Sequence, residues 1–208
     1  IYMAIILTGD GGLNALDNDL SRALATHGIA SVTIDSRRYF WSRKEPTEMA
    51  RDLKRILVHF RREWPIEGIV LVGYSFGADI LPLAYNRMPS SEKTDVTVIS
   101  LLGSSPTADF RVEFNDDNYP NERPSLPDAA LVEVPTLQCI YGKEDAAAAQ
   151  VCLSLAKTRP DVELLETEGD HSYAGLADHL ADIIAAPLLS RKPADSPALK
   201  LPGTHHAR

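Results

Sequence analysis

One pentapeptide constrains this chain more than any other feature. Residues 73 to 77 are Gly-Tyr-Ser-Phe-Gly, a Gly-x-Ser-x-Gly pattern whose serine is Ser75. An apolar run from Gly68 to Val72 precedes it, and a helical pattern from Phe76 to Met88 follows it. The glycines allow a sharp corner, because a Cβ at either end would collide with the neighbouring strand or helix. The pattern predicts a strand-turn-helix corner that presents Ser75 as a nucleophile. The alternative is a serine that closes an ordinary turn.

Short apolar runs alternate with amphipathic stretches along most of the chain. We expect strands at 2–7, 29–34, 68–72, 95–102, 134–141 and 162–166. We expect helices at 14–27, 45–64, 76–88, 146–157 and 173–189. Strands that alternate with helices in this way form a mostly parallel sheet, here six-stranded, with helices on both faces.

Length and composition favour one domain. A chain of 208 residues with 44% hydrophobic content can bury a substantial core. We place this domain at residues 1–189 and expect a disordered tail at 190–208, where Pro, Ala, Lys and Ser occur without periodicity. Residues 103–133 interrupt the alternation, and we expect them to pass over the strand ends and shape a pocket. Because the chain begins at Ile1 and not at Met, we expect an excised domain or a processed chain.

The charge of the chain excludes some partners. Its formal net charge of −8 would repel nucleic acid phosphates, so a neutral or cationic ligand is expected. No apolar run approaches the ~20 residues that span a bilayer. The glycine-rich loop at residues 9–12 lacks both the Gly-x-Gly-x-x-Gly pattern and the Walker lysine of nucleotide sites. We therefore regard nucleotide binding as the weaker interpretation, and we predict neither a cofactor nor a metal.

Ser75 needs a base and an acid, because a serine hydroxyl is a poor nucleophile near neutral pH. Asp145 follows the strand at 134–141, and His171 follows the strand at 162–166. Both therefore stand at carboxyl strand ends, where an open parallel sheet places its site. The order Ser, Asp, His is that of the α/β-hydrolases. We predict an α/β-hydrolase fold with Ser75, Asp145 and His171 as its catalytic residues.

Two further acids could take the place of Asp145. Glu144 is its neighbour, and Asp109 follows the strand at 95–102, a position from which some hydrolases of this kind supply their acid. The sequence leaves this choice open. An oxyanion hole also needs two backbone N–H groups. We expect one from Phe76, directly after the nucleophile, and one from the loop at residues 9–12, with Asp10 as the candidate.

Four segments in order resemble the bacterial VirJ/AcvB family. They are residues 7–12, 35–42, 73–79 and 83–87, and the resemblance extends to about Leu189. It implies an α/β-hydrolase-like domain in the periplasm of a Gram-negative bacterium, associated with virulence. It also implies hydrolysis of aminoacylated phosphatidylglycerol at a membrane surface, notably of the lysyl ester, with Ser75 as nucleophile. The chain departs from the family pattern in having an alanine run after residue 145 and a single histidine in residues 169–172.

A lysyl ester carries ammonium groups that acidic side chains could bind. The candidates for substrate binding are Asp10, Asp79 and Asp109. Each has a structural alternative, respectively bracing its loop, bonding to nearby backbone, and capping a turn. A different hypothesis is a non-catalytic accessory of virulence or secretion that binds a protein partner on a hydrolase scaffold.

Cys139 and Cys152 are the only cysteines. An even count in a chain that resembles a periplasmic family favours a disulfide, because that compartment oxidises thiols. A strand and the helix after it can bring two Cα atoms within the ~7 Å that a disulfide needs. The alternative is two buried free thiols. A disulfide here would clamp the turn that carries Asp145.

Overall fold

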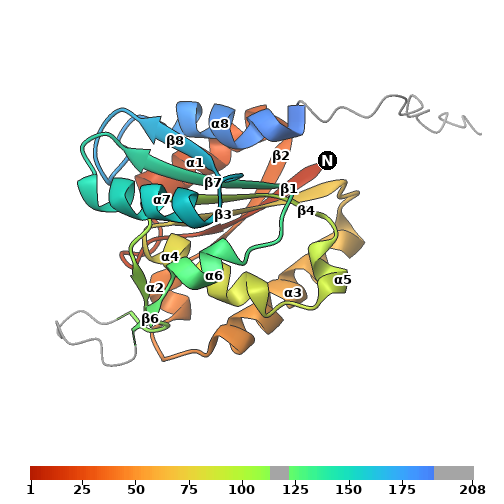
Figure 1. Ribbon diagram of the computed structural model, residues 1–208. Coiled ribbons are helices and arrows are strands. Elements are labelled where there is room, and N and C mark those ends of the chain that lie inside the picture. The colour runs from red at the N-terminus through yellow and green to blue at the C-terminus, as the bar shows by residue number, and fades with distance from the viewer. Residues whose placement is uncertain (113–121, 190–208) are drawn as a thin grey trace, which may run out of the picture.

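The computed structural model describes residues 1–112 and 122–189, and these form one central sheet with a layer of helices on each face (Figure 1). The sheet has the order β2-β1-β3-β4-β7-β8, and every neighbouring pair is parallel. Its strands are β1 Tyr2–Leu7, β2 Ile29–Ile34, β3 Gly68–Tyr74, β4 Val96–Leu102, β7 Thr136–Gly142 and β8 Glu163–Thr167. The predicted six-stranded parallel sheet is confirmed, whereas the predicted tail at 190–208 lies outside the described residues.

The helices divide between the two faces of the sheet (Figure 1). One face packs against α1 Ala15–Thr26 and α8 Ala177–Leu189. The other face packs against α3 Pro46–Glu63, α4 Phe76–Asn86, α6 Leu126–Ala130 and α7 Ala146–Thr158. Two further helices of four residues each are α2 Ser36–Tyr39 and α5 Ser90–Lys93. Along β1 the side chains alternate between the two faces. Ile5 and Leu7 pack on the face covered by α3, α4, α6 and α7, and Ala4 and Ile6 pack on the face covered by α1 and α8. All four are fully buried, so the continuous apolar run of β1 follows from burial of both faces.

The long connection after β4 is partly ordered into small elements. Residues Thr107–Ala108 form β5 and residues Arg123–Pro124 form β6, and these two short strands pair antiparallel. Helix α6 follows them and packs near α4 and α7. Part of the connection, residues 113–121, lies outside the described residues.

The last helix begins later than its sequence pattern predicts. The pattern begins at Tyr173, but α8 begins at Ala177. Tyr173 has a φ of 50° and a fully buried ring, so it belongs to the turn that carries His171. A positive φ cannot be accommodated in a right-handed helix. The expected helix start was therefore wrong by four residues.

Cys139 of β7 and Cys152 of α7 form the disulfide that the cysteine count favours. Their Cα atoms lie 5.5 Å apart, and both residues are fully buried. The disulfide links the two elements on either side of the turn that ends in Asp145. None of the helices within 1–112 and 122–189 combines the length and hydropathy required to cross a membrane.

Candidate active site

The corner between β3 and α4 holds Ser75 in an uncommon backbone conformation. Its φ is 52°, a region that L-residues rarely occupy. A Cβ on Gly73 would lie 2.5 Å from the carbonyl oxygen of Gly77, and a Cβ on Gly77 would overlap the carbonyl oxygen of Leu7. Both glycines are therefore required for this close approach, as the Gly-x-Ser-x-Gly pattern predicts.

The corner stands at the switch point of the sheet. Strand β1 lies between β2 and β3, so the chain leaves β1 toward one edge and later returns to β3 on its other side. In open parallel sheets the crevice outside such strand ends is the usual ligand site. Ser75 follows β3 and Asp10 follows β1, so the sheet order brings both to this crevice.

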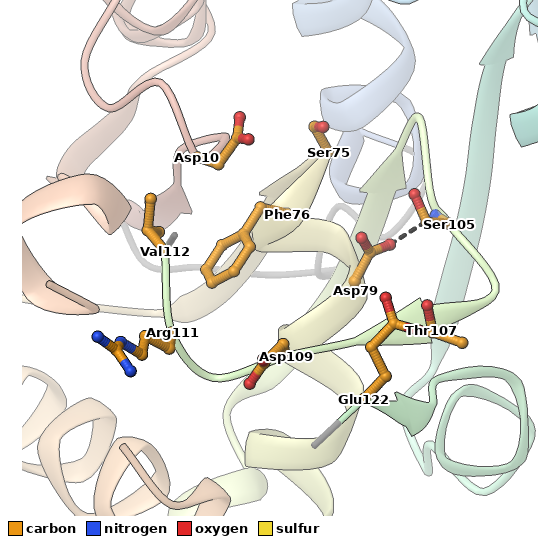
Figure 2. Close-up of a pocket in the computed structure, with 10 residues that line it drawn as sticks. All are labelled: Asp10, Ser75, Phe76, Asp79, Ser105, Thr107, Asp109, Arg111, Val112 and Glu122. Atoms are coloured by element: carbon orange, nitrogen blue, oxygen red, sulfur yellow. Dashed lines mark hydrogen bonds between the residues drawn. The ribbon is translucent and has the colours of Figure 1, made fainter. Parts of the chain in front are cut away.

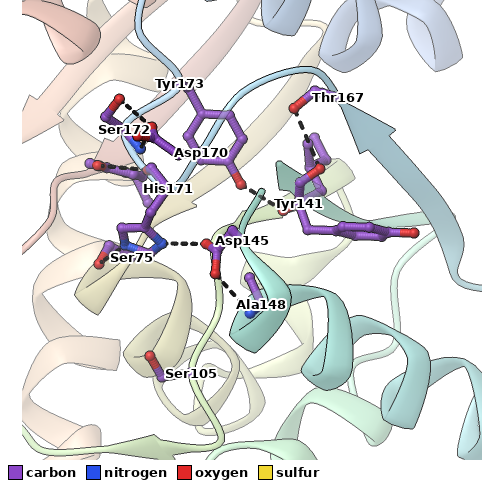
Figure 3. A network of polar contacts seen from close by, with 12 residues as sticks. Ser75, Ser105, Tyr141, Asp145, Ala148, Thr167, Asp170, His171, Ser172 and Tyr173 are labelled. Carbon is purple, nitrogen blue, oxygen red and sulfur yellow. Dashed lines mark hydrogen bonds and ion pairs between the residues drawn. The ribbon is translucent and has the colours of Figure 1, made fainter. Parts of the chain in front are cut away.

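Ser75, His171 and Asp145 are joined by two hydrogen bonds (Figure 3). The Oγ of Ser75 lies 2.8 Å from Nε2 of His171, and Nδ1 of His171 lies 2.6 Å from Oδ2 of Asp145. A carboxylate accepts only, so Nδ1 donates to Asp145 and Nε2 is left to accept from the serine hydroxyl. The folded chain thus joins three side chains that lie on three separate strand-end turns.

Their partners distinguish Asp145 from the other two candidate acids. Asp145 also caps α7, because its Oδ1 accepts a hydrogen bond of 3.1 Å from the backbone N–H of Ala148. The neighbouring Glu144 is exposed, and its backbone N–H donates to the carbonyl of Gly169 at 2.9 Å. Asp109 forms an ion pair with Arg43. Of the three acids, Asp145 is the one hydrogen-bonded to His171.

Two tyrosines fix the turn that carries His171. The hydroxyl of Tyr74 donates to the carbonyl of His171 at 3.1 Å, and the hydroxyl of Tyr173 donates to the carbonyl of Ile140 at 2.9 Å. Burial raises the pKa of both hydroxyls above their usual range, so both remain donors at physiological pH. Sequence reasoning missed these residues, although Tyr74 lies inside the pentapeptide.

A pocket of about 220 Å³ opens beside Ser75 (Figure 2). In the part of the chain that the structure describes, its wall is mostly polar and carries four carboxyl groups and one guanidinium. The lining residues are Asp10, Ser75, Phe76, Asp79, Ser105, Thr107, Asp109, Arg111, Val112 and Glu122. The three acids predicted as substrate contacts all line this pocket. Among the described residues, no group of His, Cys, Asp and Glu side chains could hold a metal ion.

The three predicted acids have different surroundings. Asp10 is exposed, and Asp109 is buried in its ion pair with Arg43, whose Nη2 lies 3.1 Å from Oδ2. Asp79 is 7% exposed and accepts a hydrogen bond of 2.5 Å from the backbone N–H of Ser105. Burial raises the pKa of Asp79 well above its usual range, and the nearby charge of Asp10 adds to this rise. Burial therefore disfavours the charged form of Asp79.

Phe76 has the position expected of an oxyanion-hole donor. It is the first residue of α4, so its backbone N–H has no acceptor within the helix. Phe76 and Asp10 both line the pocket beside Ser75. The second donor, the N–H of Asp10, stays a prediction.

The family model for bacterial virulence protein VirJ matches residues 2–192. The chain belongs to the VirJ family. This agrees with the resemblance carried by the four sequence segments. A comparison with curated proteins finds no match.

Solved structures similar to this VirJ family member include several esterases. A carboxylesterase of the thaumarchaeon Nitrososphaera gargenis has a TM-score of 0.66 at 14% identity, covering 91% of this chain and 92% of that chain. A lipase-esterase related protein of Clostridium acetobutylicum has a TM-score of 0.64 at 13% identity, covering 89% and 93%. The esterase domain of a Rhodothermus marinus protein has a TM-score of 0.62 at 13% identity, covering 88% and 85%. At these identities the likeness shows the fold alone, and that fold is the α/β-hydrolase fold.

Proposed function

We propose that this chain is a serine hydrolase that cleaves the aminoacyl ester of aminoacylated phosphatidylglycerol, the lysyl ester among them. The observation that carries the proposal is the chain of hydrogen bonds from Ser75 through His171 to Asp145, with distances of 2.8 and 2.6 Å. Such a chain gives the hydroxyl a base and gives the base an orienting acid.

The first half of the reaction forms an acyl-enzyme. The Oγ of Ser75 attacks the carbonyl carbon of the ester, and its proton passes to Nε2 of His171. Asp145 holds the ring in the required tautomer and stabilises the imidazolium. The carbonyl oxygen becomes an oxyanion, which the N–H of Phe76 and the N–H of Asp10 stabilise. The intermediate collapses, the bond to the glycerol oxygen breaks, and His171 gives its proton to that oxygen.

The second half regenerates the enzyme. A water molecule gives its proton to Nε2 of His171 and attacks the acyl carbon, and the same oxyanion donors act again. Collapse of this intermediate breaks the bond to Oγ, which takes the proton back from His171. The products are a free amino acid and phosphatidylglycerol, and the net reaction consumes one water.

The substrate class is supported by charge and by the family. The pocket beside Ser75 carries the acidic side chains of Asp10 and Asp79, which suit an acyl group that bears ammonium. The family resemblance implies the phospholipid. The disulfide between Cys139 and Cys152 is typical of an oxidising compartment, which supports residence in the periplasm.

A direct test uses vesicles that contain lysyl-phosphatidylglycerol, with released lysine measured by mass spectrometry. A fluorophosphonate probe is applied to the same protein. We expect lysine release and probe labelling in the unchanged protein and neither in Ser75→Ala. Ser90→Ala, at an exposed serine of α5, is the matched control and should behave as the unchanged protein. Absence of both labelling and release in a folded protein would overturn the proposal and favour an accessory that binds a protein partner.

A further inference from the structure

We propose that Asp79 binds the α-ammonium group of the acyl moiety, so that the pocket selects α-aminoacyl esters as a class and does not depend on the ε-ammonium of lysine. This inference rests on the proposed function, because it names which part of the substrate the same site recognises. It assigns to Asp79 the role of a specificity-determining residue in substrate binding.

The first argument is the unbalanced charge of Asp79. Asp79 lies on α4 and lines the pocket, and its buried carboxyl accepts a hydrogen bond of 2.5 Å from the backbone N–H of Ser105. Within residues 1–112 and 122–189, no lysine or arginine forms an ion pair with it. A buried carboxylate without a cation is costly, and a bound ammonium removes that cost. Asp109 in the same pocket differs, because Arg43 already neutralises it.

The second argument is distance along α4. The backbone N–H of Asp79 donates to the carbonyl of Ser75 at 3.1 Å, so Asp79 lies one helical turn after the nucleophile. In an α-aminoacyl group the nitrogen lies only about 2.5 Å from the acyl carbon that Ser75 attacks. Ser75 and Asp79 line the same pocket (Figure 2), so an α-ammonium held beside Ser75 comes within reach of the Asp79 carboxylate.

The third argument is the position of the remaining wall. The ε-nitrogen of lysine sits at the end of a flexible four-carbon stem, so it extends past Asp79. The side chain then lies along Thr107, Arg111 and Glu122, which line the part of the pocket contributed by the connection after β4. This wall holds charges of both signs and so favours no single kind of side chain. Alanyl and lysyl esters should both be substrates.

The test compares two pairs of esters that share one leaving group. Alanyl and lysyl esters carry the α-ammonium, and propionyl and 6-aminohexanoyl esters are their counterparts without it. Each kcat/KM is divided by the rate of alkaline hydrolysis, because the α-ammonium activates an ester chemically. We expect each α-amino ester to exceed its counterpart by about 10- to 100-fold, the range for a hydrogen bond to a charged group.

Asp79→Asn keeps an acceptor for the N–H of Ser105 and removes only the charge. We expect it to lower kcat/KM for the alanyl and lysyl esters by about 10- to 100-fold, mainly through KM, so that both ratios approach one. Glu63→Gln removes a carboxylate at an exposed site at the end of α3, outside the pocket, and should keep both ratios.

The outcomes separate this inference from the proposed function. Cleavage of propionyl esters as fast as alanyl esters, or an unchanged ratio in Asp79→Asn, would overturn the inference and leave the esterase intact. A preference for lysyl and 6-aminohexanoyl esters together over alanyl esters would also overturn it, since the ε-ammonium would then be the group recognised. Failure to cleave any of the four esters would overturn the proposed function and this inference with it. The ranking of substrates by the unchanged protein decides the matter even where Asp79→Asn fails to fold.

Discussion

Ser75 lies between two groups of polar side chains, His171 with Asp145 on the histidine side and the acids of the pocket on the pocket side. The charges on these two sides are balanced in different ways. On the histidine side, Asp145 accepts from both His171 and the backbone N–H of Ala148, so its two oxygens are each satisfied. On the pocket side, Asp79 has a backbone donor but no cation among the described residues. Under the proposed function, the histidine side is complete without substrate, whereas the pocket side is completed by one. On that proposal, this difference separates the residues that would perform the chemistry from those that would recognise the ligand.

The histidine side is also the more firmly connected. The N–H of Lys143 donates to the carbonyl of Thr167 at 2.8 Å, and the N–H of Glu144 donates to Gly169 at 2.9 Å. These bonds join the turn of Asp145 to the turn of His171 directly. Groups held in this way need little reorganisation during the reaction, which is the condition for efficient acid-base catalysis.

The largest expected effect comes from removing the groups that exchange the proton. Ser75→Ala and His171→Ala should each lower kcat for ester hydrolysis by about four orders of magnitude or more, because residues of such a unit act together. Both side chains are outside the core, so thermal unfolding should change little. Steady-state kinetics and calorimetry on the two variants measure this. A folded His171→Ala protein with near-normal turnover would remove His171 from the mechanism.

A smaller effect tests the acid on the same side. Asp145→Asn should lower kcat less than His171→Ala but still by about 10³- to 10⁴-fold, because an amide can hold the imidazole in the wrong tautomer. Glu144→Gln, at the adjacent exposed position, should stay within a few-fold of the unchanged protein. The two variants are compared by kcat on one ester. The reverse ranking would transfer the role to Glu144.

The corner and the order of the candidate residues could be predicted because both are local features of the sequence. Gly73 and Gly77 indicate that backbone segments approach each other closely at this corner, and apolar runs indicate where the strands end. The choice between Glu144 and Asp145 could not be predicted. It depends on which carboxylate caps α7 and on the approach of the turn at Gly169, and these are tertiary contacts.

The pocket was less predictable than the nucleophile. Arg43 and Asp109 are 66 positions apart, so nothing in the sequence indicates that one neutralises the other. The three acids look alike as sequence candidates, and only burial and pairing distinguish Asp10, Asp79 and Asp109. The periodic pattern also misled at Tyr173, whose apolar ring fits a helix but fills the core from a turn.

The disulfide should affect the histidine side through stability. The bond between Cys139 and Cys152 closes a loop of 13 positions, worth roughly 3 kcal/mol in the chain-entropy model. The double variant Cys139→Ala/Cys152→Ala should lose about that much in the free energy of unfolding by urea. Loss of kcat should be only several-fold, because the backbone bonds between the two turns remain. Equal unfolding free energies, or two free thiols per denatured and unreduced chain, would contradict this expectation.

The smallest effect is on the pocket side and has the opposite sign. Asp79→Asn should raise the melting temperature at pH 8, because it removes a buried carboxylate that has no cation. Within residues 1–112 and 122–189, the charged groups that line the pocket around it are Asp10, Asp109, Arg111 and Glu122. Of these, Asp10 is the one that raises the pKa of Asp79 further by its charge.

The sign of this effect with pH follows from the direction of the shift. Burial raises the pKa of Asp79 in the folded protein above the value of about 3.9 that it has when unfolded, so the folded state holds this proton more tightly. The folded protein is therefore favoured at low pH, and this advantage is lost as pH rises through the folded pKa. Asparagine does not titrate, so the variant should gain on the order of 2–4 °C over the unchanged protein at pH 8 and nothing near pH 4. Melting curves of both proteins across this range measure the difference. A gain in melting temperature that stays constant with pH would mean that the amide packs better than the carboxyl. A loss at pH 8 would mean that a cation already balances Asp79 and that its charge is not held for a ligand.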